Sequence, residues 1–208
     1  MIWTAHKHLA SASDGIKTGD GTGVGFFIPL NPSLAAQFPS LGEEDRSPPH
    51  VTFLYVGNVP KDREAQLVAV ANTVFQGWIR GHVTGQLTDM EYFEQPAKDR
   101  RVAVMQLRFS HDMAGLRWRL RDALQEAGFV VDDSFPLIWR QHTTLAYLDG
   151  IDAVFDGSIP QGSWDFDGIE VWGMSKVYTA HFDEATRTVA KVASRHIDAM
   201  RHEVSVEL

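Results

Sequence analysis

The apolar and polar positions along the chain follow two periods, one typical of strands and one typical of helices. Six segments are short runs rich in β-branched and aromatic residues, and most of them are followed by Gly, Asn or charged residues, so we interpret them as strands. The predicted strands cover residues 23–30, 50–59, 81–93, 100–109, 138–148 and 168–182.

Two other segments have apolar residues at steps of three and four, which places these residues along one face of a helix. The first predicted helix lies within residues 61–79, and the second lies within residues 113–127, where Gly128 is placed to end it. Asn31 is followed by a proline and is a cap candidate for a short helix after the first strand.

These elements form an approximate internal repeat. A strand, a helix, a loop and a second strand follow one another in residues 23–57, and the same series recurs in residues 101–148. Two similar halves of this kind predict an α+β, bilobal fold. In it, two pseudo-symmetric antiparallel-sheet lobes face each other across a central cleft, and the helices pack outside.

The repeat also predicts how the chain is divided. We assign residues 23–182 to one two-lobed domain and residues 1–22, which are rich in Gly, Ser, Thr and Asp, to an irregular lead-in. Residues 183–208 form a C-terminal extension, for which the spacing of apolar residues favours a helix over a returning hairpin strand.

Three predicted strands carry a histidine and a threonine two residues apart, which we call a His-x-Thr triplet. The triplets are His50-Val51-Thr52, His82-Val83-Thr84 and His142-Thr143-Thr144. Because side chains alternate between the two faces of a strand, the histidine and the threonine of one triplet point to the same side. Burying such a polar pair costs free energy unless it is hydrogen-bonded or has a function.

Two such pairs that face each other predict acid–base chemistry on a phosphoester. A histidine titrates near pH ~6.5 and can donate or accept a proton at neutral pH, and a threonine hydroxyl can donate a hydrogen bond to a phosphate oxygen. One histidine takes a proton from the attacking oxygen and the other protonates the leaving oxygen, which requires no metal. Arg140 lies two residues before His142 and adds a guanidinium suited to phosphate if the strand already runs there.

The triplets at 50 and 142 differ in setting from the one at 82. They occupy equivalent places in the two repeated halves, and each is followed by apolar residues on both faces, as expected of central strands. His82 lies in a predicted strand with one polar and one apolar face, so we expect it to be an ordinary surface residue.

With the motifs PHVTFLYVG and QHTTLAYLDG in equivalent halves, the sequence resembles the 2H phosphoesterase superfamily, which includes the RNA 2',3'-cyclic phosphodiesterases called 2'-5' RNA ligases. The resemblance covers about residues 23–182. It implies a metal-independent site in the central cleft, no cofactor, and cleavage of RNA ends, 2'-5' or 3'-5' oligonucleotides or cyclic nucleotides. By motif match, His50 and His142 are the acid–base pair, and Thr52 and Thr144 bind the phosphate.

Composition limits the partners. The formal net charge of -8 argues against binding along long nucleic acids, because such affinity comes from neutralising many phosphates, whereas a small nucleotide or a nucleic-acid end needs only a local positive field. The chain has no Cys, which excludes disulfides and a cysteine nucleophile. It also lacks a long apolar run and a secretory leader, so we expect no membrane partner and a cytoplasmic location. If the protein is encoded by a phage, that location is the cytoplasm of the host.

Aromatic side chains are candidates for stacking on a nucleobase. Strand alternation turns one set away from the His-x-Thr faces, namely Phe53, Tyr55, Trp139 and Tyr147. It leaves Trp3 and Tyr178 as candidates.

The alternative to catalysis is a nucleotide-binding or assembly module that uses the same fold without turnover. The apolar face of the predicted C-terminal helix would then be a surface for a partner. The sequence leaves the substrate, the oligomeric state and the division of acid and base roles between His50 and His142 open.

Overall fold

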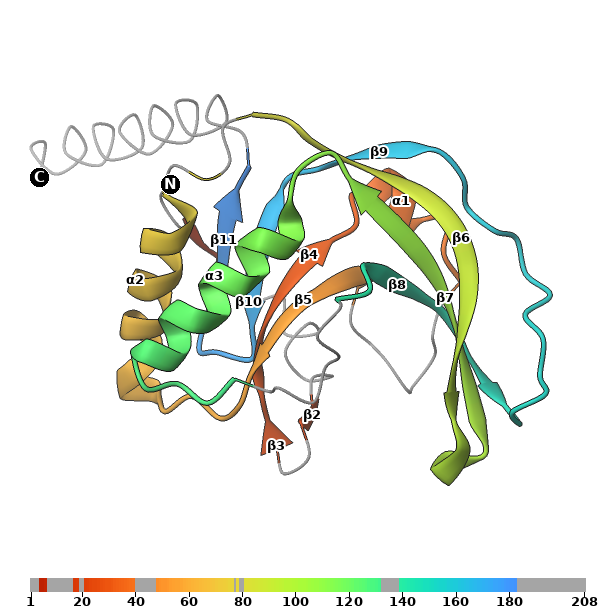
Figure 1. Cartoon of the computed structure of the whole chain (residues 1–208), viewed down its shortest axis with the longest axis horizontal. Coiled ribbons are helices and arrows are strands. Elements are labelled where there is room, and N and C mark those ends of the chain that lie inside the picture. The colour runs from red at the N-terminus through yellow and green to blue at the C-terminus, as the bar shows by residue number, and fades with distance from the viewer. Residues whose placement is uncertain are drawn as a thin grey trace, which may run out of the picture.

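Antiparallel strands make up most of the fold, with two longer helices beside them (Figure 1). The computed structural model describes residues 4–6, 17–18, 21–39, 48–76, 78, 81–131 and 139–182. The helices are α1 (Pro32–Ala35), η1 (Lys61–Arg63), α2 (Glu64–Phe75), η2 (Pro96–Lys98) and α3 (Met113–Glu126). The strands are β1 (Thr4–His6), β2 (Lys17–Thr18), β3 (Gly21–Thr22), β4 (Val24–Pro29), β5 (His50–Val56), β6 (Val83–Gln95), β7 (Arg100–Phe109), β8 (His142–Asp149), β9 (Ser163–Phe166), β10 (Gly168–Trp172) and β11 (Val177–His181).

Nine of these strands form one curled sheet in the order β1-β11-β10-β4-β5-β8-β7-β6-β9, and every neighbouring pair is antiparallel. We call β1, β11, β10, β4 and β5 the His50 half, and β8, β7, β6 and β9 the His142 half. The halves meet between β5 and β8, where Val51 and Thr143 are the one pair in register among the described residues. The predicted α+β class and antiparallel sheets are confirmed, and the two lobes are halves of a single sheet.

The main core packs the two longer helices against the His50 half and continues onto the His142 half, with buried residues such as Leu107, Phe109 and Phe166. Helix α2 buries Leu67, Ala71 and Phe75, and α3 buries Leu116 and Leu120 among others, at the helical spacing that the sequence predicts. Helix α3 ends as expected, because Gly128 adopts the left-handed conformation with φ of 78°. Although α3 belongs to the second repeat, it packs beside α2 and against β5.

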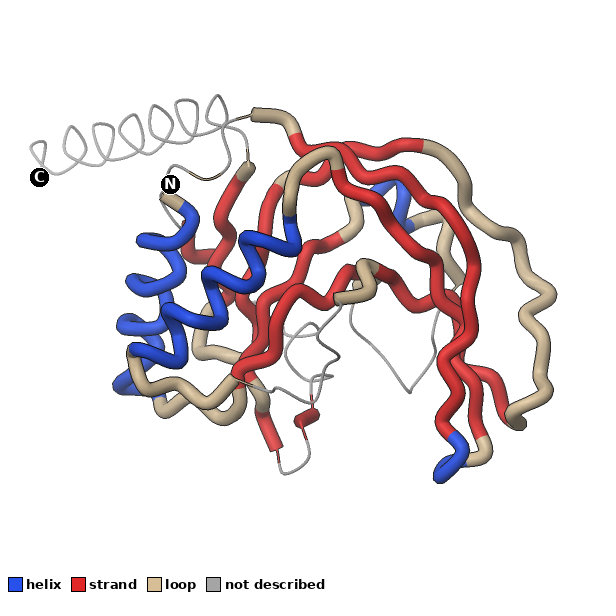
Figure 2. The backbone as a smooth tube through the Cα atoms, viewed as in Figure 1, coloured by secondary structure: helices blue, strands red, loops and turns tan. Residues whose placement is uncertain are grey.

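The His142 half is covered differently from the His50 half. The connection from β8 to β9, residues 150–162, runs as an irregular segment along its outer side (Figure 2). The backbone N–H of Phe155 donates to the Tyr92 hydroxyl at 3.0 Å, and Arg101 donates to the Ala153 carbonyl at 3.3 Å. Loop backbone therefore packs where the other half has helices.

Three other segments differ from the expected elements. Residues 168–182, predicted as one strand, form the hairpin β10–β11, which turns at Gly173 with φ of 85°. The sequence pattern does not predict strand β9. Within residues 1–22, β1 pairs with β11 at the sheet edge and β2 pairs with β3. The expected extension, residues 183–208, lies outside the described residues.

Among the described helices, none combines the length and the apolar character needed to cross a bilayer.

Candidate active site

The pairing of β5 with β8 brings the two predicted motifs together. Val51 and Thr143, the middle residues of the triplets, are paired and are almost fully buried on the core side of the sheet. Because side chains alternate, the flanking residues of both triplets point to the opposite side, which we call the site face. In an antiparallel pair each histidine then lies across from the threonine of the other strand. The four predicted residues on the site face are His50, Thr52, His142 and Thr144.

Both histidines are held in the same way. The Nδ1 atom of His50 lies 2.8 Å from the Pro48 carbonyl oxygen, and Nδ1 of His142 lies 2.7 Å from the Arg140 carbonyl oxygen. A carbonyl can only accept, so Nδ1 carries the proton in each ring and Nε2 is the nitrogen that exchanges protons. The two halves therefore present two histidines of the same tautomer.

A β-bulge follows the first triplet and changes which side chains share the site face. Opposite Phe26 and Phe27 of β4 lie Leu54 and Thr52, so that Phe53 is an extra residue in β5. The extra residue resets the alternation, and Tyr55, across from Gly25, lies on the same face as Thr52.

The second triplet is followed by the same irregularity. Ala103 and Val104 of β7 lie across from Ala146 and Thr144, so Leu145 is the extra residue, and Tyr147 shares the face of Thr144. The expectation that Tyr55 and Tyr147 face away is therefore wrong. It is confirmed for Phe53, which is buried in the core, and for Trp139, which packs against that core.

Two donors hold the bulge of β5 from the other repeat. The buried Arg117 of α3 donates from Nε to the Phe53 carbonyl at 2.8 Å, and Trp139 donates from Nε1 to the Thr52 carbonyl at 3.0 Å. These carbonyls lie where the irregular strand does not pair regularly, so the donors satisfy groups that would otherwise be costly to bury. Sequence reasoning missed Arg117, because it resembles the surface arginines around it in the helix.

Aromatic rings surround His50. Its ring makes edge-to-face contacts with Phe27 at 4.9 Å and with Trp172 at 5.0 Å between centroids, and those two rings stack on each other at 4.4 Å. Trp172 donates from Nε1 to Glu170 at 2.7 Å. Phe27 and Trp172 are fully buried, so they support the histidine and are not surfaces for a base.

The two aromatic candidates for stacking are not placed at the site. Tyr178 is paired with Val171 and packs against the main core, on the side of the sheet away from Trp172. Trp3 lies outside the described residues.

Charged and polar groups surround His142. Phe93 contacts its ring edge-to-face at 4.7 Å, and Glu91 lies two residues before Phe93 on β6. The Glu91 carboxylate accepts from Gln106 at 2.9 Å and lies 3.4 Å from the Arg140 guanidinium.

Arg140 is not placed by strand alternation, because β8 begins only at His142. Its backbone carbonyl holds the His142 ring, while its side chain is 59% exposed and extends toward Glu91 over the Phe93 ring. The role of Arg140 as a phosphate ligand stays a prediction, as do the roles of the two histidines and two threonines.

The surroundings lower the pKa of His142. Burial is the largest cause, because it disfavours the charged ring, and the positive charges of His50 and Arg140 act in the same direction. The hydrogen bond to the Arg140 carbonyl and the negative charge of Glu91 raise the pKa and oppose this shift in part. His142 is thus mainly neutral at neutral pH.

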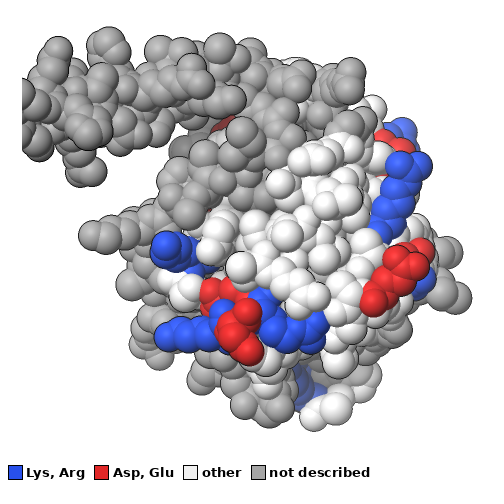
Figure 3. Space-filling view, turned by 90° about the vertical axis from the view of Figure 1, so that its left-hand side faces the viewer, with Lys and Arg blue, Asp and Glu red and all other residues white. Residues whose placement is uncertain are grey.

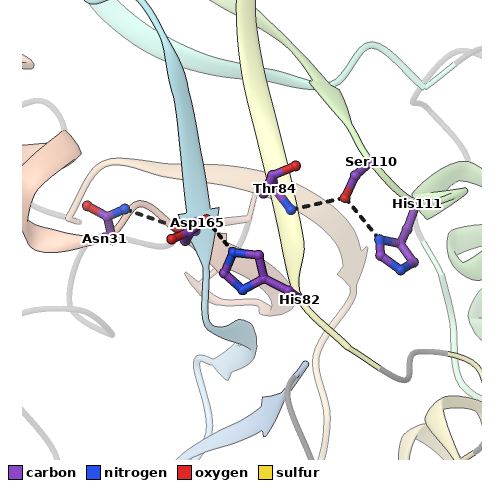
Figure 4. Close-up of polar contacts among 6 residues, drawn as sticks. All are labelled: Asn31, His82, Thr84, Ser110, His111 and Asp165. Carbon is purple, nitrogen blue, oxygen red and sulfur yellow. Dashed lines mark hydrogen bonds and ion pairs between the residues drawn. The ribbon is translucent and has the colours of Figure 1, made fainter.

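The third triplet has a different setting, shown in Figure 4. His82 lies 2.6 Å from Asp165 of β9, and both side chains are largely exposed. Beside it, the Thr84 backbone donates to the Ser110 hydroxyl, which lies 3.0 Å from Nδ1 of His111. The prediction that His82 is a surface residue is confirmed.

The described part of the chain has no group of three or more His, Asp or Glu side chains placed to hold a metal ion. On the side of the molecule that carries α2, described Lys and Arg side chains lie next to Asp and Glu, without a continuous basic area there (Figure 3).

Comparison with known proteins gives similarities of fold. Neither family models nor curated protein sequences match the chain. Among solved structures, TT0787 of Thermus thermophilus has a TM-score of 0.52 at 13% identity and covers 72% of this chain and 86% of its own. Kluyveromyces marxianus Usb1 has a TM-score of 0.50 at 8% identity, with 77% and 98% covered.

Escherichia coli LigT, in a structure complexed with 3'-AMP, is a weaker neighbour with a TM-score of 0.47 at 21% identity, covering 76% of this chain and 94% of its own. These neighbours are members of the 2H phosphoesterase superfamily. The chain therefore shares its fold with TT0787 and Usb1, the two neighbours described above with TM-scores of 0.50 or more.

Proposed function

We propose that the protein is a metal-independent phosphodiesterase of the 2H type, acting on a nucleotide or RNA end by two-histidine acid–base catalysis. One observation carries the proposal. Two His-x-Thr pairs lie on equivalent strands that meet at the pairing of Val51 with Thr143. In each pair, a backbone carbonyl accepts a hydrogen bond from Nδ1 of the histidine. Equal tethers make Nε2 the proton-exchanging nitrogen of each ring.

For a 2',3'-cyclic phosphate, the proposed reaction adds one water. Nε2 of one histidine takes a proton as the water oxygen bonds to phosphorus, and Nε2 of the other donates a proton to the ribose oxygen as its bond to phosphorus breaks. The hydroxyls of Thr52 and Thr144 donate to the non-bridging oxygens, and Arg140 balances part of the phosphate charge. With a neighbouring hydroxyl in place of water, the same steps cleave a linear phosphodiester.

The environment of His142 suggests how the roles divide. Because burial lowers its pKa, His142 is the ring that enters the reaction neutral and accepts the first proton. His50 then carries the proton that the leaving oxygen receives.

The substrate class follows from charge. A net charge of -8 favours a small nucleotide or a strand end over a long polyanion. We propose 2',3'-cyclic phosphates, 2'-5' or 3'-5' oligonucleotides and cyclic dinucleotides as the compounds to test, and a cytoplasmic site of action.

Product analysis tests the proposal. The wild-type protein and the His50→Gln and His142→Gln variants are incubated in EDTA with this panel, and products are identified by mass spectrometry. We expect turnover by the wild type alone, with circular dichroism showing that the variants fold. If no compound of the panel is converted to product, and calorimetry shows binding of intact nucleotide, the result would support the non-catalytic binding module instead.

A further inference from the structure

A carboxylate lies on the flank of the candidate site and has no catalytic role in the mechanism above. Glu91 projects from β6 beside the His142 half of the site face, where its Oε2 accepts from Gln106 at 2.9 Å and lies 3.4 Å from Arg140. Gln106 is the β7 residue directly across from His142. Glu91 is thus held between a neighbour of the histidine and the predicted phosphate ligand.

This position puts a carboxylate near His142, which in the proposed function acts on the phosphate of the substrate. Phe93, two residues along the same face of β6, touches the His142 ring, and the Glu91 side chain is 45% exposed and so accessible to a ligand. The charge of Glu91 also acts on His142, whose pKa it raises.

A carboxylate here distinguishes ligands by their charge. A phosphodiester carries one negative charge, whereas a phosphomonoester loses a second proton near pH 6, as phosphorylated side chains do with a pKa of about 6, and is mostly dianionic at neutral pH. Repulsion by a fixed carboxylate is larger for the dianion. Ring opening of a cyclic phosphate converts the first kind of ligand into the second.

We propose that Glu91 is a specificity-determining residue that selects monoanionic phosphodiesters and repels dianionic phosphomonoesters, including the product of the reaction. This inference rests on the proposed function. In this inference Glu91 transfers no proton. Arg140 pairs with Glu91 in this structure, and in the complex it also contacts the phosphate of a bound diester.

The test compares two single-charge changes on one strand. Glu91→Gln removes the charge on the site face. Glu94→Gln is the matched control, because Glu94 lies on the opposite face of β6 and pairs with Arg101 at 3.3 Å. With adenosine 2',3'-cyclic phosphate as substrate, KM is measured together with the inhibition constants of adenosine 2'- and 3'-monophosphate.

For Glu91→Gln we expect the ratio of each monophosphate inhibition constant to the KM of the cyclic phosphate to fall about three- to ten-fold. This is the size expected when one extra unit charge on the ligand no longer meets a partly exposed carboxylate. The effect should fade at pH 5, where the monoester is a monoanion. Glu94→Gln should leave the ratio unchanged.

Two results would overturn the inference and differ from failure of the proposed function. An unchanged ratio in Glu91→Gln, or an equal loss of affinity for diester and monoester, would show that Glu91 only positions Arg140 or only supports the fold. If the wild type neither hydrolyses nor binds any of these nucleotides in calorimetry, the proposed function fails and the role of Glu91 fails with it.

Discussion

His50 and His142 have the same backbone setting and opposite surroundings. Each follows a carbonyl that holds Nδ1, and each is followed by a threonine, a bulge and a tyrosine on the same face. Yet His50 lies against two fully buried aromatic rings that stack on each other, whereas His142 lies beside one half-buried ring and a group of polar and charged side chains.

The difference shows which parts of a repeated motif set geometry and which set chemistry. Strand pairing, bulge and tether repeat in the two halves and place both histidines on the site face with the same tautomer. The neighbours do not repeat, and two identical rings in identical surroundings would have no reason to divide the roles of acid and base.

The largest expected effect is on catalysis, and it should be equal in kind for the two halves. His50→Gln and His142→Gln should each lower kcat/KM by about 10²- to 10⁴-fold, because each removes one partner of the proton transfer. Initial-rate assays on whichever nucleotide is turned over measure this. His82→Gln changes the third triplet and should leave kcat/KM unaltered. A loss of kcat/KM in His82→Gln as large as in the other two variants would contradict the assignment of His50 and His142 as the acid–base pair.

The next effect separates the two halves by stability. Trp172→Ala should lower the free energy of unfolding by about 3–5 kcal/mol, because it empties a fully buried site behind His50. Phe93→Ala, beside His142, should cost less than about 2 kcal/mol, because a half-buried ring removes less apolar area. Urea denaturation measures both. Equal losses would show that the two surroundings differ less than their burial indicates.

A smaller effect concerns the bulge in β5. Arg117→Met keeps the apolar stem but removes the donor to the Phe53 carbonyl, and should cost about 1–3 kcal/mol for a buried acceptor left unpaired. Trp139→Phe removes only the neutral donor to Thr52 and should cost about 0.5–1.5 kcal/mol. Denaturation measures both losses of stability. The kcat of each variant is a second measurement, which reports whether the bulge still positions the Thr52 side chain for catalysis. Unchanged stability in Arg117→Met would mean that the bulge forms without this support.

The smallest effect is a dependence of stability on pH. Because the pKa of His142 is lower in the folded chain, the unfolded chain takes up a proton first as the pH falls through about 6.5. The free energy of unfolding therefore decreases toward lower pH, by at most about 1.4 kcal/mol per pH unit for one proton. His142→Gln should remove this part of the slope and His82→Gln should keep it. A slope identical in wild type and His142→Gln would contradict the pKa shift.

Much of the fold could be predicted because periodicity reports which face of an element is buried. The apolar runs predict β4, β5, β7 and β8, and helical spacing predicts α2 and α3. The hairpin β10–β11 is indistinguishable from one strand in the sequence, because Gly173 to Lys176 interrupts the apolar pattern without a strong turn signal.

The candidate site was predictable in part. The His-x-Thr triplets are local in sequence, so alternation placed each pair on one face. The bulges were not predictable, because a run such as FLYV after Thr52 is equally typical of a strand buried on both faces; only pairing with β4 reveals the extra residue. Arg117 and Glu91 were missed for a related reason, since their partners lie far away in the sequence.

The seam between β5 and β8 has a consequence for how the protein folds. It joins Val51 to Thr143, which are 92 positions apart (143 minus 51), and Arg117 of α3 holds the Phe53 carbonyl next to it. Closing so long a loop is slow compared with forming helices or adjacent hairpins. During refolding we therefore expect nucleotide hydrolysis to return last, after far-ultraviolet ellipticity has recovered. The rate at which hydrolysis returns would then report the rate of the final folding step.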